Sequence, residues 1–149
     1  MTPPPVVRNL VLLLARVAIG MVFFAHGWQK LFANGMDGTA AFFEQAGVPA
    51  AQLSAWFAAL VELIGGAALV LGIAVPVAGT LLALDMLGAY LFVHAGNGMF
   101  VEEHGYELVL TLGAASLLLA AVGPGRYSLD HLLFGRRKAA ATPSSPARA

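Results

Sequence analysis

The sequence predicts an all-α integral membrane protein, a bundle of four transmembrane helices, and three observations lead to this prediction. Of its 149 residues, 59% are hydrophobic and only 11% are charged, whereas about 25% are charged in an ordinary soluble domain. The mean hydropathy is +0.80. Four apolar runs cover residues 10–27, 53–74, 76–93 and 108–122. None of them has the polar face that a surface helix of a soluble protein needs.

The lengths of the four runs suit a bilayer. As helices they would measure roughly 22 to 33 Å, and the hydrocarbon core is about 30 Å thick. The last run is the shortest, but Tyr106 and Glu107 before it can extend it into the interface, and Gly123 and Pro124 stop it. The second and third runs are separated by a single residue, so we expect a tight antiparallel hairpin.

The segment between the first two runs, residues 28–52, is too apolar for an open loop. Residues 39–46 are expected to form a short helix, which Gly47 and Pro49 end. This helix could lie on the membrane surface with Phe42 and Phe43 buried. It could equally be a packing helix that covers the mouth of the bundle.

The composition shows no break that would indicate a second domain. We therefore expect an N-terminal cytoplasmic segment at 1–9, a transmembrane domain at 10–135 and a disordered basic tail at 136–149. A cleaved signal peptide is disfavoured, because no small-residue cleavage site follows the first run and Arg16 interrupts it.

Lysine and arginine positions predict the orientation in the membrane. Arg8 precedes the first run and five basic residues follow the last, whereas the first and third connections hold only Lys30. Because positive charges favour the cytoplasmic side, both termini are expected there. The lipid bilayer is the first expected partner.

Charge and cysteine content exclude several functions. The net charge is zero, so nothing attracts nucleic acid. The chain has no cysteine, which excludes disulfides, thiolate metal ligands, cysteine-held iron–sulfur clusters and dithiol chemistry. Any electron transfer would need a bound cofactor or a partner protein.

Each of the first three runs carries one charged residue away from its ends, namely Arg16, Glu62 and Asp85. A charge at the bilayer centre costs roughly 2.5 to 3.5 kcal/mol on insertion scales, so these residues need partners. Counted along the runs, they lie roughly 9 to 15 Å from the cytoplasmic edge. We therefore expect one buried polar layer, which is either a functional site or a structural ion pair that fixes helix register.

A second polar group is expected near the outer ends of the helices, and its candidate residues are His26, Lys30, His94 and Glu107. His94 lies about 180° around an ideal helix from Asp85, so the two should not share a cavity. With His104 the group has the ligand types of a metal site but no diagnostic spacing, and we predict no metal.

Four motifs in order resemble the DoxX family of bacterial membrane proteins: Arg-Val-Ala-Ile-Gly at 16–20, His-Gly-Trp-Gln-Lys-Leu-Phe at 26–32, Glu-Leu-Ile-Gly-Gly at 62–66 and Gly-Pro-Gly-Arg-Tyr-Ser-Leu-Asp at 123–130. The resemblance implies a four-helix bundle in the bacterial cytoplasmic membrane. It also implies a link to thiosulfate:quinone oxidoreductase subunits and membrane redox complexes. The positions carried over are Arg16, His26, Gly27, Lys30, Glu62, Gly65, Gly66, Arg126 and Asp130. Arg126 and Asp130, four residues apart, would pair as a structural lock at the cytoplasmic interface.

Three functions are compatible with these features. The first is a subunit of a membrane redox complex that takes electrons from a partner protein or holds a quinone between helices, with Glu62, Asp85 or His26 as proton donors. The second is a nonenzymatic assembly protein. The third is a small proton or solute transporter, formed by two copies of the chain, since intramembrane acids mark such pathways.

Overall fold

The structure is a computed structural model that describes residues 3–133, and this part of the chain contains helices and no β-strand. The helices, in chain order, are α1 (Pro5–Trp28), η1 (Gln29–Ala33), α2 (Gly35–Gln45), α3 (Ala51–Leu71), α4 (Val75–Ala89), η2 (Tyr90–His94), η3 (Val101–Glu103) and α5 (Glu107–Val122). Each predicted run corresponds to one long helix. The predicted tail at 136–149 lies outside the described residues.

The first helix begins earlier than predicted. Pro5 takes its first position, where proline has no amide hydrogen to lose and its fixed φ suits a helix. Part of the predicted N-terminal segment 1–9 is therefore helical. At its other end α1 continues without a break into η1, a π-helical segment.

The predicted hairpin between the second and third runs is present. Gly72 ends α3 in the left-handed conformation, with φ of 73°, and Ala74 is also left-handed immediately before α4. Two left-handed residues so close together reverse the chain within three positions.

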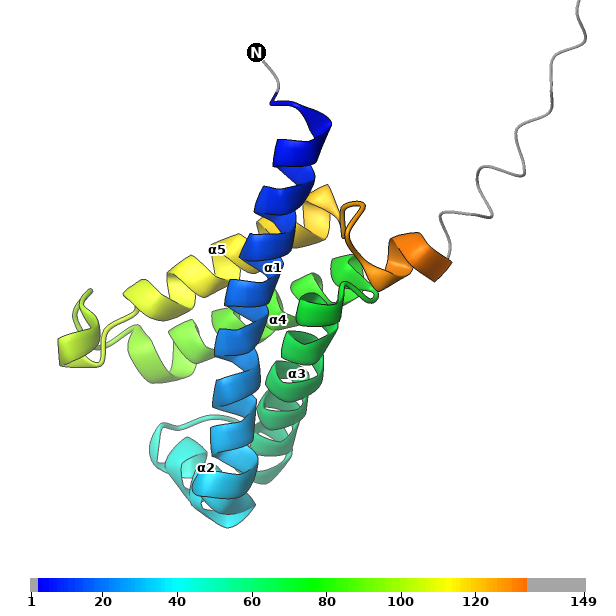
Figure 1. Cartoon of the computed structure of the whole chain (residues 1–149). Coiled ribbons are helices and arrows are strands. Elements are labelled where there is room, and N and C mark those ends of the chain that lie inside the picture. The colour runs from blue at the N-terminus through cyan, green and yellow to red at the C-terminus, as the bar shows by residue number, and fades with distance from the viewer. Residues whose placement is uncertain (1–2, 134–149) are drawn as a thin grey trace, which may run out of the picture.

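The helices pack mainly as two antiparallel pairs, α1 with α3 and α4 with α5 (Figure 1). Glycines permit the first contact: a Cβ at Gly20 would lie 2.6 Å from the Gly66 carbonyl oxygen, and one at Gly27 would overlap the backbone of Leu63. The backbones of α1 and α3 therefore touch, as expected where small residues line a helix contact in a membrane.

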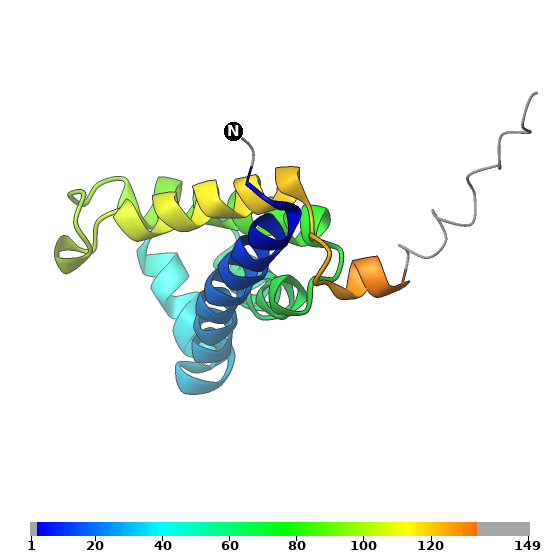
Figure 2. The same cartoon turned by 45° about the horizontal axis from the view of Figure 1, so that its top comes forward.

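The second pair runs across the first at a steep angle, which both views show (Figures 1 and 2). The arrangement is thus two antiparallel pairs that cross each other. Between the pairs lies a core whose most buried members are Phe23, Leu69, Val75 and Leu82.

Three helical stretches are long and apolar enough to cross a membrane: Pro5–Ala33, Ala51–Leu71 and Val75–His94. The fourth, α5, is apolar but has only 16 residues, which makes it roughly 24 Å long. The short helix α2 packs against α3. It begins at Gly35, four residues before the predicted start.

Candidate functional site

The polar centre of the molecule is an ion pair between Lys30 and Glu62. The Nζ atom of Lys30 lies 2.5 Å from Oε2 of Glu62, and only 3% of Glu62 is exposed. Glu62 stands on the α3 face made of small residues, which packs on α1. Side chains lean toward the N-terminus of their helix, so Lys30 reaches back one turn to meet it. The pairing offsets much of the cost of burying the carboxylate.

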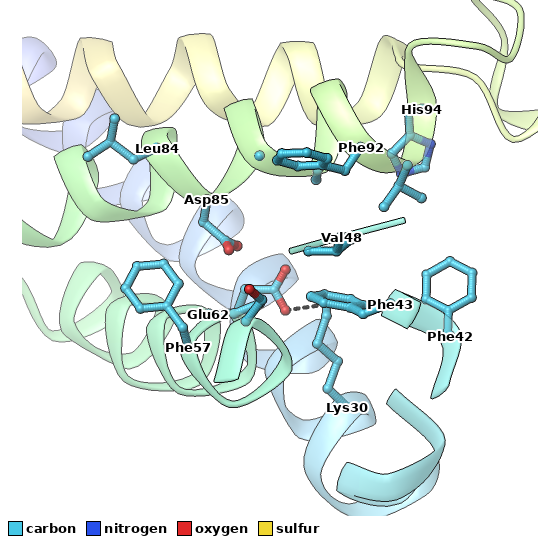
Figure 3. Close-up of a pocket in the computed structure, with 15 residues that line it drawn as sticks. Lys30, Phe42, Phe43, Val48, Phe57, Glu62, Leu84, Asp85, Phe92 and His94 are labelled. Atoms are coloured by element: carbon cyan, nitrogen blue, oxygen red, sulfur yellow. Dashed lines mark hydrogen bonds and ion pairs between the residues drawn. The ribbon is translucent and has the colours of Figure 1, made fainter. Parts of the chain in front are cut away.

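Asp85 of α4 faces this pair across a cavity (Figure 3). Its carboxyl group and that of Glu62 line the same cavity. The cluster therefore holds two carboxylates and one ammonium group. One negative charge is left over, which a proton or a ligand donor can neutralise.

Two π-helical segments bring basic side chains to the cluster. Lys30 lies in η1 at the end of α1, and His94 closes η2 at the end of α4. A π-helix advances by a smaller angle per residue than an α-helix. A π-helical segment therefore changes the direction in which all later side chains of the helix point. His94 consequently lines the same cavity as Asp85, and the prediction that they could not share one is wrong.

The first cavity has a volume of about 240 Å³ and lies between α2, α3 and α4. Lys30, Glu62 and Asp85 form its polar end. Four phenylalanines line it and leave its mouth apolar: Phe42, Phe43, Phe57 and Phe92. Phe42 and Phe57 are half exposed, at 52% and 50%. This cavity therefore opens among apolar side chains that face away from the protein.

The second cavity, of about 250 Å³, lies between α1, α4 and α5. Lys30, Glu62 and His94 line both cavities. The second one adds His26 from α1 and His104 from the loop after η3. The ion pair thus borders both cavities, of which only the second is also lined by His26 and His104.

Arg16 is not part of this cluster, so the predicted layer of Arg16, Glu62 and Asp85 does not form. Arg16 is fully buried, and its guanidinium donates hydrogen bonds to the carbonyl oxygens of Leu69 and Tyr127, at 3.3 and 2.5 Å. Leu69 lies seven residues beyond Glu62 on α3, roughly 10 Å along its axis. Glu62 takes Lys30 as its partner instead.

The predicted outer group is divided by the structure. Lys30 joins the buried cluster, and His26 and His94 line cavities. Glu107 lines neither cavity: its Oε1 accepts a hydrogen bond of 2.8 Å from the Val101 amide and holds the η3 loop. Among the described residues, no three His, Asp or Glu side chains are placed to hold one metal ion.

Arg126 and Asp130 do not pair with each other, contrary to prediction, since Lys30 and Glu62 form the one ion pair within the described residues. The Arg126 amide donates to Oδ1 of Asn9, and the Asp130 amide donates to the Gly72 carbonyl oxygen. The segment after α5 is therefore tied to α1 and to the α3–α4 turn. These bonds use the backbone amides of the two residues, whereas the prediction paired their side chains.

Sequence reasoning missed two features of the site. It did not assign Lys30 to Glu62, although both are in the motifs quoted above, because it had no register between the first two runs. It also gave no role to Phe57 and Phe92, which look like ordinary apolar residues in apolar helices.

The chain is similar in sequence to a known family and to several known proteins. Residues 11–95 match the DoxX family. The chain is 38% identical over 127 residues to CatD of Bacillus subtilis (strain 168), named as a presumed oxidoreductase, which covers 85% of this chain and 89% of CatD.

Two further relatives are named as membrane proteins. Inner membrane protein YqjF of Escherichia coli (strain K12) is 34% identical over 122 residues, covering 81% of this chain and 90% of YqjF. Membrane protein Rv3486 of Mycobacterium tuberculosis (strain ATCC 25618 / H37Rv) is 33% identical over 136 residues, covering 83% of this chain and 82% of Rv3486. No solved structure matches the chain. The chain belongs to the DoxX family of membrane proteins.

Proposed function

We propose that this protein is a quinone-binding subunit of a membrane redox complex in the bacterial cytoplasmic membrane. One observation carries the proposal: buried Glu62 and partly buried Lys30 and Asp85 stand at the polar end of an aromatic-lined cavity. Ligand sites for apolar molecules typically combine such walls with a few convergent polar groups.

The cluster fits the chemistry of a quinone head group. The Lys30 ammonium can donate a hydrogen bond to a quinone carbonyl, and the two carboxylates can accept from the hydroxyls of a quinol. Oxidation of a quinol releases two protons and two electrons. Glu62 and Asp85 would take up protons, and the electrons would pass to a redox centre of a partner protein, because this chain has no cysteine to hold a cluster.

The exposed side chains that line the first cavity support the entry of a lipid-soluble ligand from the bilayer. Leu84 of α4 and Phe92 of η2 line the same cavity as Asp85 and are 56% and 44% exposed. In a bilayer such side chains meet acyl chains, so a lipid-soluble ligand would reach the cluster without crossing water. The presumed oxidoreductase activity in the name of CatD agrees with a redox role.

The topology proposed with this function has four membrane spans, α1, α3, α4 and α5, and both termini in the cytoplasm. Tilting accommodates the steep crossing of the two pairs, since transmembrane helices tilt by up to about 40°. In this arrangement α2 lies at the outer interface, where Phe42 is exposed to the acyl boundary.

Quinone extraction tests the proposal. The full chain is purified in mild detergent from quinone-containing membranes, and bound quinone is measured by solvent extraction and absorption spectra. We expect near-stoichiometric quinone with the wild type and a strong loss with Glu62→Gln. Glu102→Gln is the matched control, because Glu102 is exposed and lines neither cavity. Wild-type protein free of quinone would contradict the proposal.

A further inference from the structure

We propose that the second cavity is a proton path that joins the Lys30–Glu62 pair to water at the loop of residues 101–105. The path would serve the ligand chemistry proposed above, and in that respect it rests on the proposed function. Its existence follows from how the cavity is built, and its tests need no ligand.

The two cavities open to different surroundings. The first has an apolar mouth formed by half-exposed phenylalanines. The second reaches the surface at His104 and Val101, which are exposed residues of a polar loop that also contains Glu102 and Glu103. Both cavities end at Glu62, of which 3% is exposed. A lipid-soluble ligand and water would therefore approach the same carboxylate from opposite sides.

The second cavity has room for a chain of water molecules. Its volume is about 250 Å³, and a water molecule takes about 30 Å³ in the liquid. The polar groups that line it, Lys30, Glu62, His26, His94 and His104, can hold such molecules by hydrogen bonds. Water needs two or more polar partners to be stable inside a protein, and these residues supply them.

Two of the histidines are held in the tautomer that can accept a proton from the cavity. Nδ1 of His26 lies 2.9 Å from the Val22 carbonyl oxygen, and Nδ1 of His94 lies 2.7 Å from that of His104. A carbonyl oxygen only accepts, so Nδ1 carries the hydrogen and donates in both bonds. Nε2 is then the free acceptor on each ring.

The proton transfer balances at each step. A proton leaves the Glu62 carboxyl group and binds Nε2 of His26, directly or through a water molecule, and the imidazolium then releases the same proton to water toward His104. His26 returns to its starting tautomer. The titratable groups around Glu62 are Lys30 and His26 from the α1 side and Asp85 and His94 from the α4 side, with His104 at the mouth.

Neither of the two cavities extends to the α3–α4 turn. Leu69, Val75 and Leu82 are 0% exposed and line neither of the two cavities. Gly20 and Gly66 bring the backbones of α1 and α3 into contact in the same region. Protons should therefore exchange only at the side of the 101–105 loop, which is the outer side in the proposed topology.

Single-cysteine labelling tests water access. The chain contains no native cysteine, so Met86→Cys and Leu82→Cys each provide one thiol, one turn apart on α4. Met86 lines the second cavity, whereas Leu82 lines neither. Gly96→Cys, in the exposed loop between η2 and η3, marks the outer side. The reagent is a charged, membrane-impermeant methanethiosulfonate, added to sealed vesicles of the full chain.

We expect Met86→Cys to react at least about tenfold faster than Leu82→Cys, since the reagent attacks a thiolate in contact with water. It should react only from the side that labels Gly96→Cys. Equal rates for the two α4 thiols, or labelling of Met86→Cys from the opposite side, would overturn the proposal. Should Met86→Cys fail to fold, Val109→Cys replaces it, because Val109 lines the same cavity from α5.

Infrared spectroscopy tests the role of His26. The carboxyl bands of Glu62 and Asp85 are identified by difference against Glu62→Gln and Asp85→Asn in proteoliposomes, and the pH outside is then changed rapidly. The bands should follow the outside pH, and His26→Gln should slow the response by about tenfold or more, since glutamine cannot carry a proton. An unchanged response would overturn the relay. If the protein failed to bind quinone, the labelling rates and the infrared response would still test the proton path.

Discussion

The Nζ atom of Lys30 lies 2.5 Å from Oε2 of Glu62, and this pair joins the π-helical end of α1 to the buried face of α3. It closes the first cavity on one side and the second on the other. A lysine so near the end of an apolar helix could extend its ammonium group into the interface. The Lys30 side chain points inward instead, so the pair is the polar centre of the molecule.

Replacing one partner of the Lys30–Glu62 pair should destabilise the fold more than replacing both. Lys30→Met leaves Glu62 buried beside Asp85 without a cation, and we expect a loss of about 3 to 5 kcal/mol in unfolding free energy. The double variant Lys30→Met with Glu62→Leu should lose clearly less than the sum of the two single variants. Chemical denaturation in detergent measures all three. Simple additivity would argue against a coupled pair.

The glycine contact between α1 and α3 should not tolerate a methyl group. Gly27→Ala places a Cβ against the Leu63 backbone, which cannot move aside as a side chain could. The helices must separate, and we expect a lower melting temperature. Gly88→Ala is the matched control, since no atom lies within 4 Å of its added Cβ. Alanine there should favour the helix by up to about 1 kcal/mol. Equal effects of both substitutions would contradict the packing described.

Arg16 should hold the segment after α5 in place. Arg16→Met removes its bonds to the Leu69 and Tyr127 carbonyl oxygens, and a charged hydrogen bond contributes about 1.5 to 3 kcal/mol. Trypsin should then cleave after Arg126 faster than in the wild type. Arg8→Met serves as the control because Arg8 is exposed. An unchanged cleavage rate would show that Asn9 and Gly72 hold the segment without Arg16.

Asp85→Asn should leave the fold intact. It removes the second carboxylate of the cluster and keeps the Lys30–Glu62 pair, so the remaining charges balance. The melting temperature in detergent should stay equal or rise, since a buried charge is costly when it has no cation of its own. A fall in melting temperature as large as that caused by Glu62→Gln would show that the Asp85 carboxylate stabilises the fold.

The helices could be predicted from sequence because length and apolarity alone determine them in a bilayer. The positions of the predicted runs agree with α1, α3, α4 and α5, and the resemblance to DoxX proteins is confirmed by the family match. Small residues, among them Ala58 and Gly65, share one side of the helix with Glu62, and they predict that Glu62 faces protein. Its exposed fraction of 3% agrees with that expectation.

The partners of the charged residues could not be predicted, because they depend on helix register. Depth counted from the ends of apolar runs placed Arg16 near Glu62, but the contact of Gly20 with Gly66 sets Arg16 beside Leu69 and Gly72. The same register brings Lys30 to Glu62. One contact between two glycines therefore decides which charges meet.

The position of His94 could not be predicted for a different reason. Ideal helical periodicity places it opposite Asp85, but η2 changes the phase before His94 is reached. Nothing in the residues Tyr90 to His94 signals a π-helical turn. The crossing of the two helix pairs is likewise a property of packing, and four similar apolar runs carry no information about it.

Equilibrium titration with a short-chain quinone tests the central claim most directly. The full chain is placed in nanodiscs, and binding is followed by quenching of its two tryptophans. The account predicts saturable binding to the wild type and to Glu102→Gln, and an affinity at least about tenfold lower for Glu62→Gln and for Asp85→Asn, since each loses one charged hydrogen-bond partner. Equal affinity of all four proteins, or no saturable binding to the wild type, would contradict it.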